Sequence, residues 1–156
     1  MKTTKIFALL CVILLVCSCK QNDWLDWKIE NELWLVRNAE KEGVVTTPTG
    51  LQYKCIEQGH GASARPDDAK LVTITYTGHL INGHEFDSAD RYMGYVSSFV
   101  PGFKEGLKKM YEFGIYEFYI PYDLGYGEKG AGNEGTDNHI PPYSTLIFRV
   151  QLDAVN

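Results

Sequence analysis

Apolar and polar residues alternate with a period of two in three segments of the chain, 51–56, 71–80 and 145–152. In the last segment every second residue is large and apolar: Leu146, Phe148, Val150 and Leu152. Because successive strand residues point to opposite faces, this alternation predicts three half-buried strands. Residues 115–120 are predicted to form a further strand, which Pro121 ends.

A fifth strand is expected after residue 80. Asn82-Gly83 is a strong signal for a tight hairpin turn of type I′, in which both central residues have positive φ. The strand is expected to begin at Phe86-Asp87. It should then give way to an irregular connection that runs through Tyr95.

The next segment has a helical period. Pro101 suits the first turn of a helix, because the N–H that proline lacks has no partner there. Phe103, Leu107 and Met110 then repeat at i, i+4 and i+7. The helix is predicted to close near Gly114. Since so short a helix is marginal alone, we expect it to pack inside a curved sheet.

A longer helix is predicted at the N-terminal side of these segments. Asn22 or Asp23 can cap it, and it should run to about Glu42 and stop at Gly43. Trp24, Trp27, Asn31 and Trp34 lie close to one face. This pattern favours a stripe that packs against the domain or a second copy of the chain, with a sugar-binding surface as the alternative.

Together these segments predict an α+β fold with an N-terminal helix, about five strands and one short internal helix. Hairpins without alternating β and α segments indicate an antiparallel sheet. Residues 122–142 form a glycine-rich loop that Pro141-Pro142 ends. A loop of this length within a domain is usually functional.

Composition narrows the class of function. The 156 residues are 44% hydrophobic and 13% aromatic and carry a formal charge of −5, enough for one globular domain and an appendage. No basic patch is present in the sequence, so nucleic acid is not expected as a partner. The four histidines show no metal-ligand spacing, and no cofactor, metal site or Ser-His-Asp arrangement is predicted.

Residues 1–18 have the pattern of a signal peptide. Lys2 and Lys5 precede an apolar run from Ile6 to Val16, which is too short for a permanent membrane span. The run ends at Cys17-Ser18-Cys19, which favours a lipobox with Cys19 as the lipidated residue; an ordinary secretory signal is the alternative. Cys55 would then be the one cysteine left for the domain, and it is predicted to be a small buried hydrophobe.

From about Thr47 onward the chain resembles the FKBP-type peptidyl-prolyl isomerases. The order and spacing of several short motifs carry this resemblance: Thr-Pro-Thr-Gly-Leu-Gln-Tyr at 47–53, Tyr76-Thr77-Gly78, Phe86-Asp87-Ser88, Phe99-Val100-Pro101-Gly102-Phe103, Leu124-Gly125-Tyr126-Gly127 and Ile140-Pro141-Pro142. Residues 38–53 are similar to the envelope subgroup of the macrophage infectivity potentiator type, although the N-terminal helix here is much shorter.

The resemblance implies a five- to six-stranded antiparallel half-barrel wrapped around the short helix. It divides the chain into a signal peptide at 1–18, a lipid anchor and helix at 19–45, and an isomerase domain at 46–156. A proline-binding pocket would lie between sheet and helix, with Phe103 as its floor. Four residues would carry catalysis, Tyr76, Asp87, Tyr126 and Phe148, and the others would bind substrate: Phe86, Phe99, Val100, Phe103 and Ile140. Tyr92 or Tyr95 is expected to add a further aromatic ring.

By the same resemblance, the activity would be cis–trans isomerisation of X-Pro bonds in exported, unfolded or extended polypeptides. The alternative is an envelope chaperone with little turnover. The Tyr76 hydroxyl would hold Asp87, and Tyr126 with the backbone near Ile140 would bond substrate carbonyls. The floor is often Trp in this family, so Phe103 should weaken macrolide binding. The protein is expected in a Gram-negative envelope, anchored to the outer membrane, as a monomer or weak dimer.

Overall fold

The computed structural model describes residues 23–60 and 65–156, and the predictions for the signal peptide and Cys19 lie outside them. Within these residues the helices are α2 (Asp23–Ala39) and α3 (Pro101–Leu107), and short 3-10 turns occupy Val96–Ser98, Tyr122–Leu124 and Gly127–Lys129. The strands are β1 (Val44–Thr46), β2 (Gln52–Glu57), β3 (Leu71–His79), β4 (Glu85–Tyr95), β5 (Ile115–Ile120) and β6 (Leu146–Val155).

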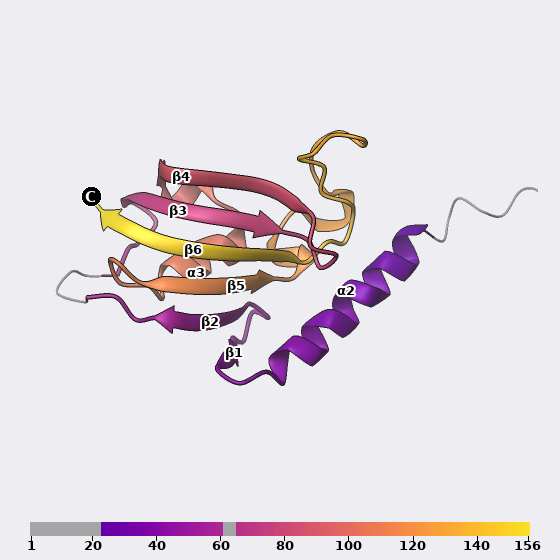
Figure 1. Cartoon of the computed structure of the whole chain (residues 1–156), viewed down its shortest axis with the longest axis horizontal. Coiled ribbons are helices and arrows are strands. Elements are labelled where there is room, and N and C mark those ends of the chain that lie inside the picture. Colours follow the sequence, from indigo (N-terminus) through magenta and orange to yellow (C-terminus); the bar gives the residue numbers. More distant parts are fainter. Residues whose placement is uncertain (1–22, 61–64) are drawn as a thin grey trace, which may run out of the picture.

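The six strands form one sheet in the order β1-β2-β5-β6-β3-β4, with antiparallel pairing throughout. Figure 1 shows the curved sheet with α3 behind it and α2 crossing at one end. The predicted α+β half-barrel around a short helix is therefore confirmed, with six strands. The predicted domain start at residue 46 falls within β1.

The core lies between the concave face of the sheet and α3. The alternation of β6 buries Leu146, Phe148, Val150 and Leu152, as its pattern predicted. Val72 and Ile74 of β3 face the same interior. On α3 the apolar stripe predicted from the helical period, Phe103 and Leu107 followed by Met110, is at most 2% exposed.

The helix α3 is shorter than predicted, since it ends at Leu107 and not near Gly114. The Lys109 N–H donates to the Gly106 carbonyl and the Met110 N–H to the Leu107 carbonyl, a spacing of three residues that closes the last turn. A Cβ at Gly106 would lie 2.6 Å from the Phe118 ring, so this glycine lets α3 approach β5 closely.

The turn between β3 and β4 lies where Asn82-Gly83 predicted it, but type I′ was wrong. Gly83 has φ of +86° while Asn82 has no positive φ, and the Gly83 N–H donates to the Leu80 carbonyl at 2.9 Å. This is a turn that needs one left-handed residue.

The irregular connection expected before Tyr95 is also wrong, because β4 continues to that residue. The irregularity is a bulge within the strand, where the partners of Ile74 and Tyr76 are Tyr92 and Ala89. At this bulge Arg91 has φ of 52°, and its N–H donates to Thr75 Oγ1.

The tryptophan face of α2 packs against the domain, as the favoured interpretation expected. The Trp27 indole N–H donates to Ser144 Oγ at 3.0 Å, and the Trp34 ring lies 5.7 Å from that of Tyr119. Between them the Thr145 N–H donates to Asn31 Oδ1 at 2.7 Å, and Asn31 is 1% exposed. The helix ends at Ala39, a few residues before the predicted Glu42. No helix among the described residues is long and apolar enough to cross a membrane.

Cys55 is exposed, so the prediction that it is buried was wrong. Its strand, β2, is covered near Leu51 and Gln52 but becomes exposed from Cys55 to Glu57. This end of the strand lines a cavity together with Lys109, which follows α3.

Candidate functional site

A small cavity of about 190 Å³ lies at the start of α3, between that helix and the concave face of the sheet. Its residues come from β3, β4, β6, α3, the turn before α3 and the long loop. The lining consists of Tyr76, Asp87, Ser98, Phe99, Val100, Phe103, Tyr126 and Phe148. Seven of these eight are residues that the sequence placed in the proline pocket, and Ser98 is the addition.

A hydrogen bond joins the two polar groups expected to work together. The Tyr76 hydroxyl, on β3, donates to Asp87 Oδ2, on β4, at 2.8 Å. Antiparallel pairing of Gly78 with Asp87 brings the two strands side by side at this point. Burial raises the pKa of Tyr76, and the bond to Asp87 raises it further, so the hydroxyl stays a donor at neutral pH. The Asp87 side chain remains exposed at the mouth of the cavity.

Phe103 forms the bottom of this cavity, and other aromatic rings surround it. The Phe148 ring stands edge-on to it, with centroids 4.9 Å apart, and the Tyr76 ring does so at 6.1 Å. The Phe99 ring is stacked on it at 4.8 Å. Since Phe103 is 2% exposed, this ring is shared by the core and the cavity.

Phe86 and Ile140 do not line the cavity, although both were expected there. Phe86 is 6% exposed and packs edge-on against Phe148, with centroids 5.4 Å apart. Ile140 is 4% exposed and forms a bridge with Ala131. Both residues therefore support the site from behind, Phe86 through the Phe148 ring and Ile140 through the loop.

The expected backbone donor near Ile140 is already occupied. The Ile140 N–H donates to the Ala131 carbonyl at 2.8 Å, and the His139 N–H donates to the Thr136 carbonyl. Val100 lines the cavity at the N-cap of α3, and no acceptor for its N–H is found within residues 23–60 and 65–156. The sequence analysis missed this donor, because the identity of a residue does not indicate whether its main-chain N–H already has an acceptor.

The structure decides between the two candidate aromatic residues of β4. The Tyr92 ring stands edge-on to Tyr76 at 6.4 Å and to Phe99 at 6.1 Å, so it flanks the cavity. Tyr95 is 57% exposed and contributes a carbonyl that accepts from Ser98 Oγ. Ser98 lines the cavity because it lies in the turn before α3. Nothing about a serine at this position predicted that role.

The long loop supplies Tyr126 to the cavity. Burial raises the pKa of Tyr126 and the neighbouring Asp87 charge adds to this, so its hydroxyl is also protonated at neutral pH. His139 is not among the lining residues, and the loop is tied to the β3–β4 turn by a 2.8 Å hydrogen bond between His84 Nε2 and the Asp137 carbonyl. Within the described residues, no group of three or more metal-ligating side chains is present.

Comparison with known proteins gives the same assignment along the chain. Residues 62–153 match the family of FKBP-type peptidyl-prolyl cis-trans isomerases, and residues 20–55 match the domain amino terminal to that isomerase. The chain is 43% identical over 128 residues to an FKBP-type 22 kDa peptidyl-prolyl cis-trans isomerase of Escherichia coli, covering 79% of this chain and 58% of that one. It is 38% identical over 132 residues to the outer membrane protein MIP of Legionella longbeachae, covering 82% and 54%.

Solved structures are similar over most of the chain. The crystal structure of FkpA from Escherichia coli is 34% identical with a TM-score of 0.77, covering 85% of this chain and 60% of that one. A peptidyl-prolyl cis-trans isomerase from Pseudomonas syringae pv. tomato is 26% identical with a TM-score of 0.74, covering 82% and 92%. The chain spans about half the length of the curated relatives that it matches. With its sequence, fold and aromatic cavity in agreement, the chain belongs to the family of FKBP-type peptidyl-prolyl cis-trans isomerases.

Proposed function

We propose that this protein accelerates cis–trans isomerisation of X-Pro peptide bonds. The observation that carries the proposal is the hydrogen-bonded pair of Tyr76 and Asp87 at the mouth of a small aromatic cavity with Phe103 at its bottom. The reaction rotates an amide over a barrier of about 18–20 kcal/mol and breaks no bond. It therefore needs no nucleophile or metal, only a site that binds the twisted amide better than the planar one.

The aromatic cavity is suited to binding the twisted amide more tightly than the planar amide. Twisting the amide removes resonance and draws charge away from the carbonyl oxygen, so a site with little water favours the twisted form. We place the proline ring over Phe103, between Phe148 on one side and Phe99 with Val100 on the other. A rate gain of about 10⁵ would need roughly 7 kcal/mol of preferential stabilisation.

Polar groups at the mouth would orient the amide. Asp87, held by the Tyr76 hydroxyl, would present its carboxylate to the rotating amide without taking a proton. The Tyr126 hydroxyl and the Val100 N–H would donate to substrate carbonyls. Phe86 and Ile140 would act indirectly, since they pack behind Phe148 and within the loop that carries Tyr126.

A protease-coupled assay on an X-Pro peptide tests this proposal. We expect Asp87→Ala and Phe148→Ala to lower kcat/KM at least about tenfold, equivalent to ~1.4 kcal/mol. Asp26→Ala, which removes an exposed carboxylate from α2, should leave the rate unchanged. A wild-type rate equal to that of buffer would exclude the isomerase and leave the alternative, an envelope chaperone that binds peptides with little turnover.

We propose an envelope location with a lipid anchor at Cys19. Relatives named MIP and FkpA come from Gram-negative bacteria, and the MIP of Legionella longbeachae is named an outer membrane protein. The partners would be proline-containing unfolded or extended polypeptides in that compartment. The anchored protein would be sorted to the outer membrane. Fractionation tests the anchor: Cys19→Ala should move the protein out of the membrane fraction, and its retention there would exclude the anchor.

The oligomeric state is proposed to be a monomer that pairs weakly through α2. Support comes from an exposed apolar stripe on this helix, formed by Leu25, Ile29, Leu33 and Val36. Seventeen helical residues offer a smaller interface than a long helix would. Sedimentation over a range of concentrations should show a monomer at low concentration and a dimer that Leu33→Glu removes. A single monomeric species at every concentration would exclude the dimer.

A further inference from the structure

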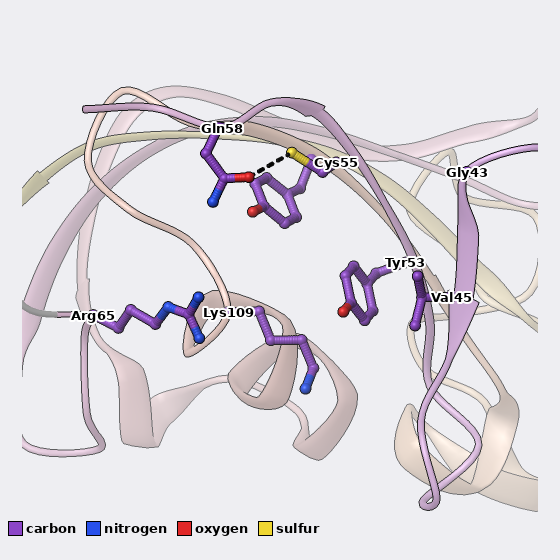
Figure 2. A pocket seen from close by; sticks show the side chains of 8 residues that line it. Gly43, Val45, Tyr53, Cys55, Gln58, Arg65 and Lys109 are labelled. Atoms are coloured by element: carbon purple, nitrogen blue, oxygen red, sulfur yellow. Dashed lines mark hydrogen bonds between the residues drawn. The ribbon is translucent and has the colours of Figure 1, made fainter. Parts of the chain in front are cut away.

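A second cavity, of about 330 Å³, lies at the opposite end of α3 from the proline pocket. Its lining residues come from β1, β2, β5, the loop after β2 and the residues that follow α3. Figure 2 shows seven of these residues, labelled, around the open space. Its volume is at the lower end of the range for small-molecule sites. The lining consists of Gly43, Val45, Tyr53, Cys55, Gln58, Arg65, Lys109 and Tyr116.

The charges around this cavity are unlike those of the chain as a whole. The sequence carries a net charge of −5, yet the lining holds two cations and no carboxylate. Lys109 makes a loose ion pair with Glu105, with Nζ and Oε1 3.7 Å apart. Arg65 lies over the Tyr111 ring, 4.7 Å from its centroid, and no carboxylate within the described ranges pairs with it. About one positive charge is therefore left uncompensated.

Neutral hydrogen-bond donors complete the cavity. The Tyr53 and Tyr116 rings are stacked, with centroids 6.2 Å apart and planes 20° apart. Burial raises the pKa of Tyr116, so its hydroxyl keeps its proton at neutral pH. Gln58 Oε1 accepts from the Cys55 thiol at 3.5 Å, which leaves the Gln58 amide nitrogen as a donor. Figure 2 shows the Arg65 side chain reaching into the space below Gln58 and Cys55.

We propose that this cavity binds a small carboxylate, either a free organic acid or the carboxyl end of a polypeptide. The Arg65 guanidinium has the planar fork that matches a carboxylate in two parallel hydrogen bonds. Since Glu105 shares Lys109, the charge balance suits a monoanion better than a dianionic phosphate. The stacked tyrosines provide an apolar side for the remainder of the ligand.

Titration of the full chain with benzoate, followed by amide chemical shifts, tests the proposal. We expect saturable shifts around Tyr53, Cys55 and Gln58, and weaker binding of inorganic phosphate. A short peptide with a free carboxyl end and the same peptide as its C-terminal amide distinguish the two sources. Binding of the free end, but not of the amide, would assign the site to polypeptide ends, and benzoate binding alone would assign it to free acids. No saturable shift with any of these probes would overturn the proposal.

Charge variants provide the matched control. Arg65→Gln and Lys109→Gln should each weaken benzoate binding by about two- to fivefold, the effect of one partly exposed charge. Lys108→Gln removes the neighbouring lysine, which pairs with Asp68 at 2.8 Å outside the cavity, and should have no effect. Equal weakening in all three variants would mean a nonspecific charge effect and would also overturn the proposal.

The Cys55 thiol gives an independent readout. Thiol–disulfide exchange with dithiobis(nitrobenzoate), an aromatic disulfide carrying carboxylates, attaches half of the reagent to Sγ and releases the other half as a thiolate. The Cys55→Ser variant measures the contribution of the other cysteines. Arg65→Gln should slow the Cys55 reaction with this reagent but not with neutral dithiodipyridine. Equal slowing with both reagents would mean that the charge does not attract the carboxylate. None of these results depends on isomerase activity.

Discussion

The Phe99 ring is stacked on the Phe103 ring, with centroids 4.8 Å apart and planes 22° apart. In the family that the sequence resembles, the floor is often Trp and the residue at the position of Phe99 is usually aliphatic, whereas this chain has Phe at both positions. The two departures are complementary, because the ring at 99 occupies space beside a floor that is smaller than tryptophan. The cavity therefore stays small and aromatic although neither residue is the expected one.

Phe103→Ala is expected to lower both stability and activity. The side chain is 2% exposed and contacts the rings of Phe118 and Phe148, so its loss should cost about 3–5 kcal/mol of the free energy of unfolding. Urea denaturation measures the stability and the protease-coupled assay the activity at a temperature where the variant is folded. Phe113→Ala removes a ring that is 56% exposed and is the control. A folded Phe103→Ala variant with full activity would show that Phe103 is only part of the core.

Phe103→Trp tests the complementary relation directly. Because Phe99 fills the neighbouring space, the single variant should be overpacked and lose about 1–3 kcal/mol of stability. Phe99→Val together with Phe103→Trp should recover this loss and bind a macrolide more tightly than the wild type does. Calorimetry with a macrolide ligand gives both affinities. Equal affinity in the double variant and the wild type would mean that the size of residue 103 does not affect macrolide binding.

The hydrogen bond between Tyr76 and Asp87 can be tested by a double-mutant cycle. Tyr76→Phe removes the hydroxyl but keeps the ring, and Asp87→Asn keeps the shape but removes the charge. If the hydroxyl acts by holding the carboxylate, the two losses in kcat/KM should not add, with a coupling of about 1–3 kcal/mol. Additive losses would mean that the two groups act separately.

The sequence predicted those parts of the fold that depend on periodic patterns. Alternation along β6 marked the residues that face the core, and the stripe from Phe103 to Met110 marked the buried side of α3. Helix ends were predicted less well. The helix α3 ends at Leu107 in a turn closed by hydrogen bonds of three-residue spacing, whereas the apolar stripe continues to Met110, so periodicity extended the predicted helix too far.

For the candidate site, motifs identified side chains but not backbone donors or neighbours. Tyr76 and Asp87 were paired by resemblance, and their strands bring them into contact. Phe86 and Ile140 were expected in the lining and instead lie behind it, because a motif does not show how deeply a residue is buried. Cys55 was expected to be buried, but β2 is exposed from this residue onward and Cys55 lines a cavity, which the strand pattern alone does not show.

The packing of α2 on the domain depends on a buried amide, and Asn31→Ala tests it. The Thr145 N–H donates to Asn31 Oδ1, and the Asn31 amide donates to the Trp27 carbonyl at 2.8 Å. Removing the side chain leaves a buried N–H without its partner and should cost about 1–3 kcal/mol. Glu32→Ala changes the exposed neighbouring position and is the control. An unchanged urea midpoint for Asn31→Ala would mean that α2 and the sheet do not unfold together.

The buried tyrosines predict a stability that falls at alkaline pH. Burial raises the pKa of Tyr116 and Tyr119 above the usual value of 10.0, and the hydrogen bond that the Tyr119 hydroxyl donates to Glu117 raises the pKa of Tyr119 further. The folded state thus keeps protons that the unfolded chain releases. Their contribution is fully present below pH 10 and is lost as pH rises above it, with a slope of up to ~1.4 kcal/mol per pH unit for each tyrosine. Urea denaturation between pH 7 and 11 should give a flat profile followed by this decline.

Substitution separates the two tyrosines from the other groups that titrate in this range. Tyr119→Phe should make the free energy of unfolding fall less steeply with pH above pH 10, by the contribution of one tyrosine, because the variant has no phenolic proton to retain at this position. Tyr95→Phe removes a hydroxyl from a side chain that is 57% exposed and is the matched control. If Tyr119→Phe and Tyr95→Phe change the slope equally, burial of Tyr119 is not the cause of the decline, and the loss of stability must then arise from other groups that titrate in this range, such as Tyr76, Tyr116 and Tyr126.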